Sequence, residues 1–446
     1  MRSFLFGILA HFFCVACSAQ LPPAMQMRIY DSTRCAGYYI FSAQKFRADK
    51  SPSVSWQTIL DGNGSLIYSR ADVTCADFKQ HEDGRFSFCR DGRIYLMNRS
   101  LQICDSFVSV NGVSEYHHDF KILPNGHYLL VGVRADTADL SSLYMFRRKS
   151  AAGSRHAIVK YDVIQELDEK KNVVFQWDAE SEFSVNNALP LYLVDTLNIS
   201  MPHINSVATD ASGNIIASCR FYNQIIKIDR STGHLLWRLG GTQNQFTFLN
   251  GARQFLGQHD AHYLANGNLL FYDNGYDFDS LKRGAAAVEF RIDEFRKCVE
   301  LMWMNTFADT LTSGGGGNAC RLSGNRTLMC FGVIQDHLPN LLCAAADEKG
   351  QPIFDISYPD TLHSYRAFGY DRLRINIRRP VVRIKHRGGK TYLTVKGGDS
   401  RTVWSNGATG AETEVKSPGS YQAAIPYDCN SFLWSENACI TARDIR

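Results

Sequence analysis

A short strand, a turn that contains glycine and a second apolar strand recur along the middle of this 446-residue chain. The unit occurs in the segments Phe78 to Phe88, His118 to Val131, His203 to Ala217, His259 to Tyr272 and Asn318 to Phe331. Three copies are followed by two further strands, the second of which carries Trp177, Trp237 or Trp303. No segment keeps the helical period of 3.6 residues for long, so the pattern predicts a chain built of β-strands.

Four strands per unit, repeated at roughly forty to sixty residues, are typical of a β-propeller. Besides the five visible units, residues 21–75 and 351–372 can jointly close a sixth. We therefore predict an all-β fold with a six-bladed β-propeller over residues 20–375. The pattern changes near residues 373–380, and the short strands and tight turns of residues 376–446 predict a small immunoglobulin-like β-sandwich.

The first 19 residues have the pattern of a signal peptide. Arg2 supplies the positive charge, residues 4–15 are apolar, and Cys17-Ser18-Ala19 offers small residues before a cleavage point. The apolar run is too short for a comfortable membrane span, and no other stretch of spanning length follows it. We expect an exported protein, periplasmic or secreted, with lipidation of Cys17 as the alternative.

Two of the 13 cysteines lie in the predicted signal peptide, so 11 remain. An odd number leaves at least one cysteine without a partner inside the chain. Cys320 with Cys330, and Cys429 with Cys439, are the first candidates for disulfides, because each pair can close a short hairpin in an oxidising compartment.

The charge pattern argues against nucleic acid as a partner. The net charge is +4, and no long run of Lys and Arg or basic-aromatic stripe occurs. No Cys and His spacing matches a structural zinc site either.

Three histidines occupy matched positions in the repeat. His118 and His259 each stand eight residues before the glycine of their turn, and His203 stands ten residues before its own. Offsets that differ by two keep side chains on the same face of equivalent strands. The first strand of each propeller blade lines the central channel, so we expect the three imidazoles to converge there.

A hairpin brings an arginine to the same place. Arg220 follows the turn glycine Gly213 by seven residues, and the returning strand carries it toward His203. Its charge would oppose a metal dication, whereas a guanidinium suits the oxygens of a tetrahedral anion. Arg134, eight residues after its own turn glycine, is either a second anion ligand or a structural residue.

These segments together resemble the bacterial arylsulfotransferase family. The resemblance rests on His117-His118-Asp119 before a Leu-Pro-Asn-Gly turn, His203-Ile204-Asn205-Ser206, Ser218-Cys219-Arg220 and Gln258-His259-Asp260-Ala261, and it covers roughly residues 75 to 372. It implies a six-bladed propeller that moves a sulfuryl group from an aryl sulfate donor to a phenolic acceptor without a nucleotide sulfate donor. It also implies that neither a metal nor a cofactor is required. The last stretch is similar to sandwich modules at the ends of secreted bacterial proteins.

By the same resemblance, His259 matches the nucleophile, which forms a transient sulfohistidine and predicts ping-pong kinetics. His203 and Arg220 match residues that hold the sulfuryl oxygens. His118 matches a proton donor to the leaving phenolate, with His117 as the alternative for this role. Asn205, two residues from His203 on the same strand face, is expected to orient a ligand.

Several points stay open at this stage. The inserts at residues 135–155 and 181–202 and the loop from residue 240 to 255 are expected to decide which aryl group fits. The glycine run at residues 314–317 is interpreted as a flexible connection, because no Lys-Ser/Thr pair follows it as in a phosphate-binding loop. The alternative function is a non-catalytic propeller that binds a sulfated or anionic glycan. A homodimer is one of the assemblies open to the chain.

Overall fold

The computed structural model describes residues 20–45, 53–143, 153–188, 198–276, 283–307, 311–334, 341–358 and 362–445, without the side chains of residues 115–117 and 198. The chain divides into two compact units. The larger holds Pro23–Leu66 and Asp72–Arg378, and the smaller holds Ile67–Ala71 and Arg379–Arg446 with the segment Met1–Pro22. Strands dominate both units, and no α-helix occurs among the described residues.

Each repeat of the larger unit folds as an antiparallel sheet in which successive strands are neighbours. One sheet has the order β5 (Cys75–Gln80), β6 (Phe86–Arg90), β7 (Arg93–Met97), β8 (Ile103–Phe107). The next has β9 (Ser114–Ile122), β10 (Tyr128–Ala138), β11 (Ala157–Leu167), β12 (Val173–Asp178), with β13 (Asn198–Met201) parallel to β11. The third repeat forms β14 (Ile204–Thr209), β15 (Ile215–Cys219), β16 (Gln224–Ile228), β17 (Leu235–Leu239).

The later repeats follow the same scheme with additions at the outer edge. One sheet has β19 (His259–Tyr263), β20 (Leu269–Asp273), β21 (Ala286–Asp293), β22 (Cys298–Thr306), with β18 (Thr247–Leu249) parallel to β22. Another has β24 (Asn318–Leu322), β25 (Arg326–Cys330), β27 (Leu341–Ala346), β28 (Pro352–Ser357), with β1 (Gln26–Ile29) antiparallel to β28. A small ribbon pairs β23 (Ser313–Gly315) with β26 (Val333–Ile334).

The two ends of the larger unit meet in one sheet. β29 (Leu362–Tyr370) pairs antiparallel with β2 (Tyr38–Lys45), which in turn pairs with β3 (Val54–Asp61). The sequence interpretation had assigned residues 351–372 as a whole to this sheet, but β28 belongs to the preceding one, where it also pairs with β1. Such pairing of early and late strands closes the ring of sheets with hydrogen bonds between distant parts of the chain.

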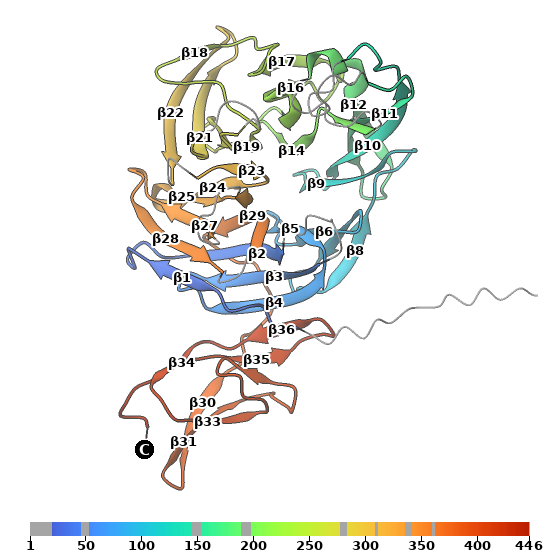
Figure 1. Ribbon diagram of the computed structural model, residues 1–446. Helices are drawn as coiled ribbons and strands as arrows, with labels where there is room; N and C mark the ends of the chain where they lie inside the picture. Colours follow the sequence, from blue (N-terminus) through green and yellow to red (C-terminus); the bar gives the residue numbers. More distant parts are fainter. Residues whose placement is uncertain are drawn as a thin grey trace, which may run out of the picture. The chain divides into compact units, whose positions relative to one another are not determined.

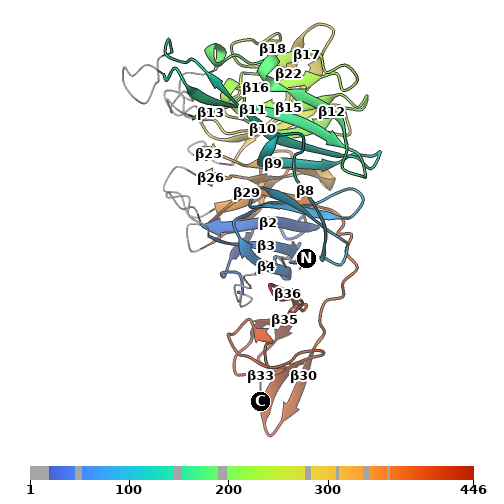
Figure 2. The same cartoon turned by 90° about the vertical axis from the view of Figure 1, so that its right-hand side faces the viewer.

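The sheets surround a common axis, with β5, β9, β14, β19, β24 and β29 innermost (Figure 1). Seen at right angles, β9 and β29 run across the thickness of the ring (Figure 2). Residues that follow one another on an inner strand therefore lie at different depths along the axis. The predicted β-propeller is confirmed, whereas the number of six blades and the boundary at residue 375 stay predictions.

The hydrophobic core lies between neighbouring sheets. Val131 and Ile164 of one sheet pack with Ile204, Val207 and Ile226 of the next, all almost without exposed surface. Residues on both faces of these strands are buried because each sheet is covered by a neighbour on either side, which explains the nearly continuous apolar runs. This packing holds the inner strands in place around the axis.

The smaller unit has its own strands and core. β30 (Val382–Arg387), β31 (Lys390–Val395) and β33 (Glu412–Val415) form one sheet, and β34 (Gly419–Tyr421) pairs with β37 (Ala438–Ile440). β32 (Val403–Trp404), β35 (Ala423–Pro426) and β36 (Ser431–Trp434) form another, in which β36 pairs with the Tyr68–Arg70 part of β4 (Leu66–Val73). Leu393, Trp404, Val415 and Ile440 form the core. Its immunoglobulin-like character stays a prediction.

The two expected disulfides are wrong, because all 11 cysteines of the described residues are free. Cys330 pairs in register with Asn318, so that Cys320 stands opposite Leu328 instead. Cys439 lies in β37 opposite Ser420, whereas Cys429 lies in the turn between β35 and β36. Closeness in sequence therefore did not translate into facing side chains in either pair.

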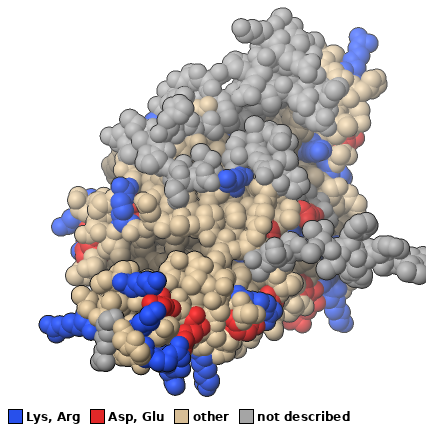
Figure 3. All heavy atoms as spheres, turned by 60° about the horizontal axis from the view of Figure 1, so that its bottom comes forward, with Lys and Arg blue, Asp and Glu red and all other residues tan. Residues whose placement is uncertain are grey.

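Charged side chains of both signs are interspersed on the face of the molecule that Figure 3 presents. This mixture agrees with the small net charge of the chain. Among the described residues, no helix is long and apolar enough to cross a membrane.

Candidate active site

Four side chains singled out in the sequence lie together at the inner strands of the larger unit. His118 lies in β9, His259 is the first residue of β19, and His203 immediately precedes β14. Arg220 begins a 3-10 turn directly after β15, and its N–H donates to the carbonyl of His203 over 3.0 Å. The rings of His118 and His203 are 4.8 Å apart.

The imidazole of His259 is held in one orientation. Its Nδ1 lies 2.9 Å from the carbonyl oxygen of Gly257 and 2.8 Å from Oδ1 of Asn274. The amide nitrogen of Asn274 is engaged as a donor to Ser313 Oγ at 2.9 Å and to the Gly316 carbonyl at 3.0 Å, so its oxygen faces the ring. Both neighbours of Nδ1 are acceptors, and Nδ1 must therefore carry the proton.

The other nitrogen of His259 is then the basic one. Nε2 accepts the backbone N–H of Gly316 over 3.1 Å, and the whole residue is only 1% exposed. Burial, followed by the positive charge of Arg220, lowers the pKa of His259 well below its ordinary value, although the bond to Asn274 acts in the opposite direction. The imidazole is neutral near pH 7, and its basic nitrogen is Nε2, whose lone pair can attack an electrophile once the Gly316 N–H has moved off it.

The glycine run at residues 314–317 lies against the guanidinium of Arg220. The Nη2 group donates to the carbonyl of Gly314, and a methyl group at Gly315 would stand 3.3 Å from Nη1. Gly314 and Gly315 belong to β23, which pairs with β26, so this part of the run is ordered strand rather than a flexible connection. The absence of side chains lets the backbone approach Arg220 on one side and His259 on the other.

Aromatic rings pack around the two remaining histidines. Nδ1 of His118 lies 2.7 Å from the hydroxyl of Tyr365, and the ring of His203 stacks on that of Phe221 at 4.3 Å with an angle of 14°. Tyr365 also stands at 6.3 Å from the His259 ring, measured between centroids. Burial, then the charges of His118 and Arg220, lowers the pKa of His203 well below its ordinary value.

A buried carboxyl group fixes the backbone at His203. This residue has a φ of +65°, a left-handed conformation that is strained for a side chain other than glycine. Asp162 lies in β11 and accepts the N–H of the next residue, Ile204, over 2.5 Å. Burial raises the pKa of Asp162 to about 8, against the lowering effect of the backbone N–H groups of Ile204 and His203. These hydrogen bonds hold His203 in its strained conformation.

Of three further residues expected from the sequence, Arg134 and Asn205 make their hydrogen bonds and ion pairs outside this cluster, and the side chain of His117 is not described. Arg134 makes ion pairs with Asp178, at 2.7 Å, and with Glu180. It lies within the long strand β10, whereas β15 ends before Arg220, so the two arginines do not occupy equivalent positions. Asn205 is fully buried and donates its amide to the carbonyl of Gln258 over 2.7 Å, so it supports the segment before His259. His117 lies in β9, but its side chain is outside the described residues.

Asn274, Tyr365 and Gly316 were missed by the sequence reasoning. Asn274 follows β20, the strand that pairs with β19, and Tyr365 lies in β29, far from the recognised segments along the chain. The only available signal was the glycine run, which was interpreted as a connection. The predicted inserts were not tested at their centres, because residues 144–152 and 189–197 lie outside the described residues.

The arrangement suits an anionic tetrahedral group. Two neutral imidazoles, a third one beside a tyrosine hydroxyl and one guanidinium offer a nucleophile, proton carriers and a donor for charged oxygens. Within the described ranges, no group of three or more His, Cys, Asp or Glu side chains is arranged to hold a metal ion.

Comparison with solved structures gives remote likenesses. A protein of unknown function from Bacteroides caccae has a TM-score of 0.48 and 10% identity, with 76% of this chain and all of that chain (100%) covered. Virginiamycin B lyase from Staphylococcus aureus has a TM-score of 0.31 and 11% identity, with 75% and 99% covered. The β-propeller domain of Cps50 (Swd1) from Myceliophteria thermophila has a TM-score of 0.33 and 10% identity, with 74% and 99% covered.

A comparison with curated proteins gives no match. The family model "Arylsulfotransferase (ASST)" matches residues 16–365. This range includes β9, β14, β15 and β19, which carry or adjoin the histidines and Arg220. On a match that covers well over half of its length, the chain belongs to the arylsulfotransferase family.

Proposed function

We propose that the protein transfers a sulfuryl group from an aryl sulfate to a phenol through His259, without a nucleotide sulfate donor. Membership of the family supports aryl sulfotransferase activity in general. The observation that carries the finer proposal is the state of His259, whose Nδ1 proton is bound by Gly257 and Asn274 while Nε2 is the basic nitrogen. A neutral imidazole that is held in one orientation is what nucleophilic attack requires.

In the first half-reaction, the hydrogen bond from the Gly316 N–H to Nε2 of His259 breaks, and the freed lone pair attacks the sulfur of the aryl sulfate. The N–S bond forms as the bond between sulfur and the aryl oxygen breaks, and the leaving oxygen takes a proton from His118. The product is a phenol and a sulfohistidine whose imidazole has gained positive charge. Negative charge on the peripheral sulfuryl oxygens is stabilised by Arg220, which provides fixed donors.

In the second half-reaction, the oxygen of an acceptor phenol attacks the sulfur of the sulfohistidine. The phenolic proton passes to His118, the N–S bond breaks, and His259 returns to its neutral form. His203, next to both His118 and Arg220, lines the space where the sulfuryl group is transferred. Because the donor's phenol leaves before the acceptor reacts, the kinetics are ping-pong.

The organisation of the whole chain belongs to the same proposal. Residues 1–19 are the signal peptide of an exported protein, residues 20–375 form a catalytic six-bladed propeller, and residues 376–446 form an immunoglobulin-like module. The inserts at residues 135–155 and 181–202 select the aryl group. A homodimer is the assembly to be tested by sedimentation.

The test is the covalent intermediate. The mature protein is mixed with nitrophenyl sulfate in the absence of acceptor, and its intact mass is measured at once. We expect the mass of one sulfuryl group to be added, with peptide mapping that assigns it to His259, and no addition in His259→Asn. A protein that binds anionic glycans without catalysis would gain no mass, and an addition retained in His259→Asn would exclude this histidine as the nucleophile.

A further inference from the structure

A network of buried charges crosses the axis of the propeller directly beside the histidine cluster. Asp77, Asp119 and Asp260 each stand seven residues before the turn glycine of their repeat, on β5, β9 and β19. The guanidinium of Arg366, a residue of β29, lies among them and is fully buried at 0% exposure. Neither the sequence motifs nor the reaction steps above use this arginine.

Arg366 connects four inner strands. Its Nη1 lies 3.2 Å from Asp77 Oδ1, 3.2 Å from Asp119 Oδ1 and 3.8 Å from Asp260 Oδ1. Its Nη2 donates to the backbone carbonyl of Asn205, beside β14's first residue, over 2.5 Å. Lys79 adds a second link, because its Nζ lies 2.5 Å from Asp77 and 2.6 Å from Asp119. The fork of the guanidinium lets Nη1 face the carboxylates while Nη2 reaches the backbone of Asn205.

The partners of Arg366 are chain neighbours of the residues in the active site. Asp119 directly follows His118, Asp260 directly follows His259, and Tyr365 directly precedes Arg366 itself. A displaced carboxylate in this network would therefore move the adjoining catalytic side chain through a single peptide unit. Asp77 is different, because its neighbours Ala76 and Phe78 carry no group of the cluster.

Backbone strain makes His259 dependent on this support. Asp260 has a φ of +55°, and the ladder between β19 and β20 is irregular between His259 and His262. A bulge of this kind re-aims the neighbouring side chains, and a strained residue keeps its conformation only where its surroundings hold it. The carboxylate of Asp260, 3.8 Å from Arg366, is one such tie.

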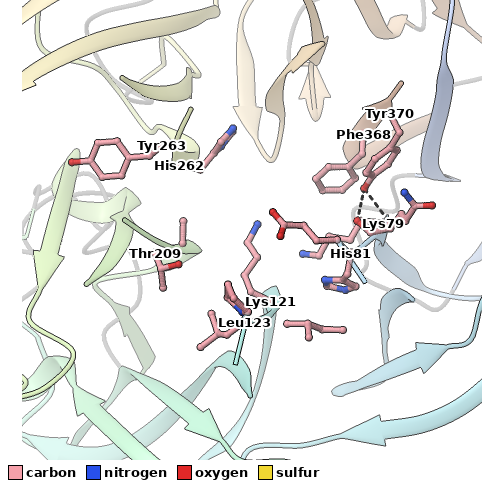
Figure 4. Close-up of a pocket in the computed structure, with 14 residues that line it drawn as sticks. Lys79, His81, Lys121, Leu123, Thr209, His262, Tyr263, Phe368 and Tyr370 are labelled. Carbon is pink, nitrogen blue, oxygen red and sulfur yellow. Dashed lines mark hydrogen bonds between the residues drawn. The ribbon is translucent and has the colours of Figure 1, made fainter. Parts of the chain in front are cut away.

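A pocket lies beside the network of buried charges. A cavity of about 300 Å³ adjoins the network, lined among others by Lys79, Lys121, His262 and Phe368. Figure 4 shows side chains from several inner strands around this space. Where a cavity replaces packed side chains, the relative position of the strands depends more on the ionic contacts beside it.

We propose that Arg366 is a positioning residue, which sets the places of His118 and His259 for sulfuryl transfer through Asp119 and Asp260. This inference rests on the proposed function for its kinetic consequence. An active-site displacement of about 1 Å can lower the rate about a hundredfold, so a shifted guanidinium is expected to reduce kcat strongly. The substrate's own contacts with Arg220 are kept, and KM is expected to change little.

The experiment compares three variants of the full-length mature protein. Arg366→Lys keeps the charge but loses the fork, and Asp260→Asn removes the tie next to His259. Asp77→Asn is the matched control, since it also removes a buried carboxylate that contacts Arg366 but adjoins no histidine. We expect kcat to fall at least about tenfold in the first two with KM within about threefold, and to stay within about threefold in the control, at comparable loss of melting temperature.

A second readout does not depend on activity. The 15N signals of the His259 ring, assigned by their loss in His259→Asn, report which nitrogen carries the proton. We expect this pattern to change in Arg366→Lys and Asp260→Asn and to persist in Asp77→Asn. A wild type without transfer activity would defeat the proposed function, whereas this comparison would still test the positioning role.

Two outcomes would overturn the inference. One is a wild-type kcat and an unchanged His259 pattern in both Arg366→Lys and Asp260→Asn. The other is an equal loss of kcat in Asp77→Asn and Asp260→Asn, because the effect would then follow the lost stability rather than the neighbouring histidine.

Discussion

Replacing Asn274 by alanine tests how His259 is prepared for attack. The side chain is fully buried and makes three hydrogen bonds, to His259 Nδ1, Ser313 Oγ and the Gly316 carbonyl. At about 1 kcal/mol for each bond, the variant loses about 3 kcal/mol of unfolding free energy. A folded domain of typical stability, about 5–15 kcal/mol, tolerates this loss.

The kinetic effect follows from the charge that His259 gains. The imidazole is neutral before attack and cationic as sulfohistidine, so the bond from Nδ1–H to Asn274 becomes a bond from a charged donor. Bonds with a charged partner contribute about 1.5–3 kcal/mol, against about 1 kcal/mol for neutral ones. The difference, about 1.4 kcal/mol, exists only in the transition state and intermediate, and its loss corresponds to a roughly tenfold lower kcat.

The assay measures nitrophenolate release from nitrophenyl sulfate with a phenol as acceptor, at saturating donor. Gln165→Ala is the matched control. Gln165 is also fully buried and its amide makes three hydrogen bonds, two with the backbone of Val110 at 3.0 Å and one to Gln176 Oε1 at 2.9 Å, none of them to a histidine. We expect both variants to lose melting temperature and only Asn274→Ala to lose kcat. If Asn274→Ala kept kcat within about twofold of the wild type, the bond to Nδ1 would have no role in the reaction.

Three more predictions follow from the described contacts. Arg220→Lys keeps the charge but loses the planar donor pair, and we expect kcat/KM for an aryl sulfate to fall about a hundredfold. An undiminished kcat/KM would exclude a role of Arg220 in binding the sulfuryl oxygens. Arg134→Ala breaks ion pairs with Asp178 and Glu180 only, so transfer rates should stay within about twofold, and a larger loss would return Arg134 to the active site. Because burial lowers the pKa of both His203 and His259, each histidine contributes unfolding free energy that is present above pH 6.5 and is lost as the pH falls. The melting temperature of the wild type should therefore drop more steeply below pH 6.5 than that of His203→Asn. Equal slopes would contradict the burial of a neutral His203.

Much of the fold could be predicted from the sequence, because the strands of one blade are neighbours along the chain. A hairpin with a glycine turn is specified by neighbouring residues, and its repetition implies the ring that buries both faces of each sheet. The matched spacing of His118, His203 and His259 from the turn glycines of their hairpins also predicted that these residues lie at inner strands. It could not tell Arg134 from Arg220, because Arg134 still lies within β10 whereas β15 ends at Cys219 and Arg220 begins the 3-10 turn that follows.

The cysteines and β28 illustrate where local pattern fails. Cys320 and Cys330 are near each other in sequence, yet the register of β24 and β25 pairs Cys330 with Asn318. β28 was expected beside β29, but β1 and β27 take it into another sheet. The register of β24 and β25 is set by the short turn between them, whereas the place of β28 depends on its hydrogen bonds with β1, a segment far away in the chain.

By itself, the sequence determined the repeat, the β-architecture and the identity of the four side chains that meet near the axis, because each depends on spacing within one hairpin. Only the tertiary structure decided which nitrogen of His259 is basic, since Ser313 and Gly316, distant in the chain, turn the oxygen of Asn274 toward Nδ1 and Gly316 donates to Nε2. Only the tertiary structure showed that Arg366 lies among three carboxylates from different repeats. Contacts of this kind form only when distant strands close into a ring, so no single segment of the sequence shows which side chains meet on the axis.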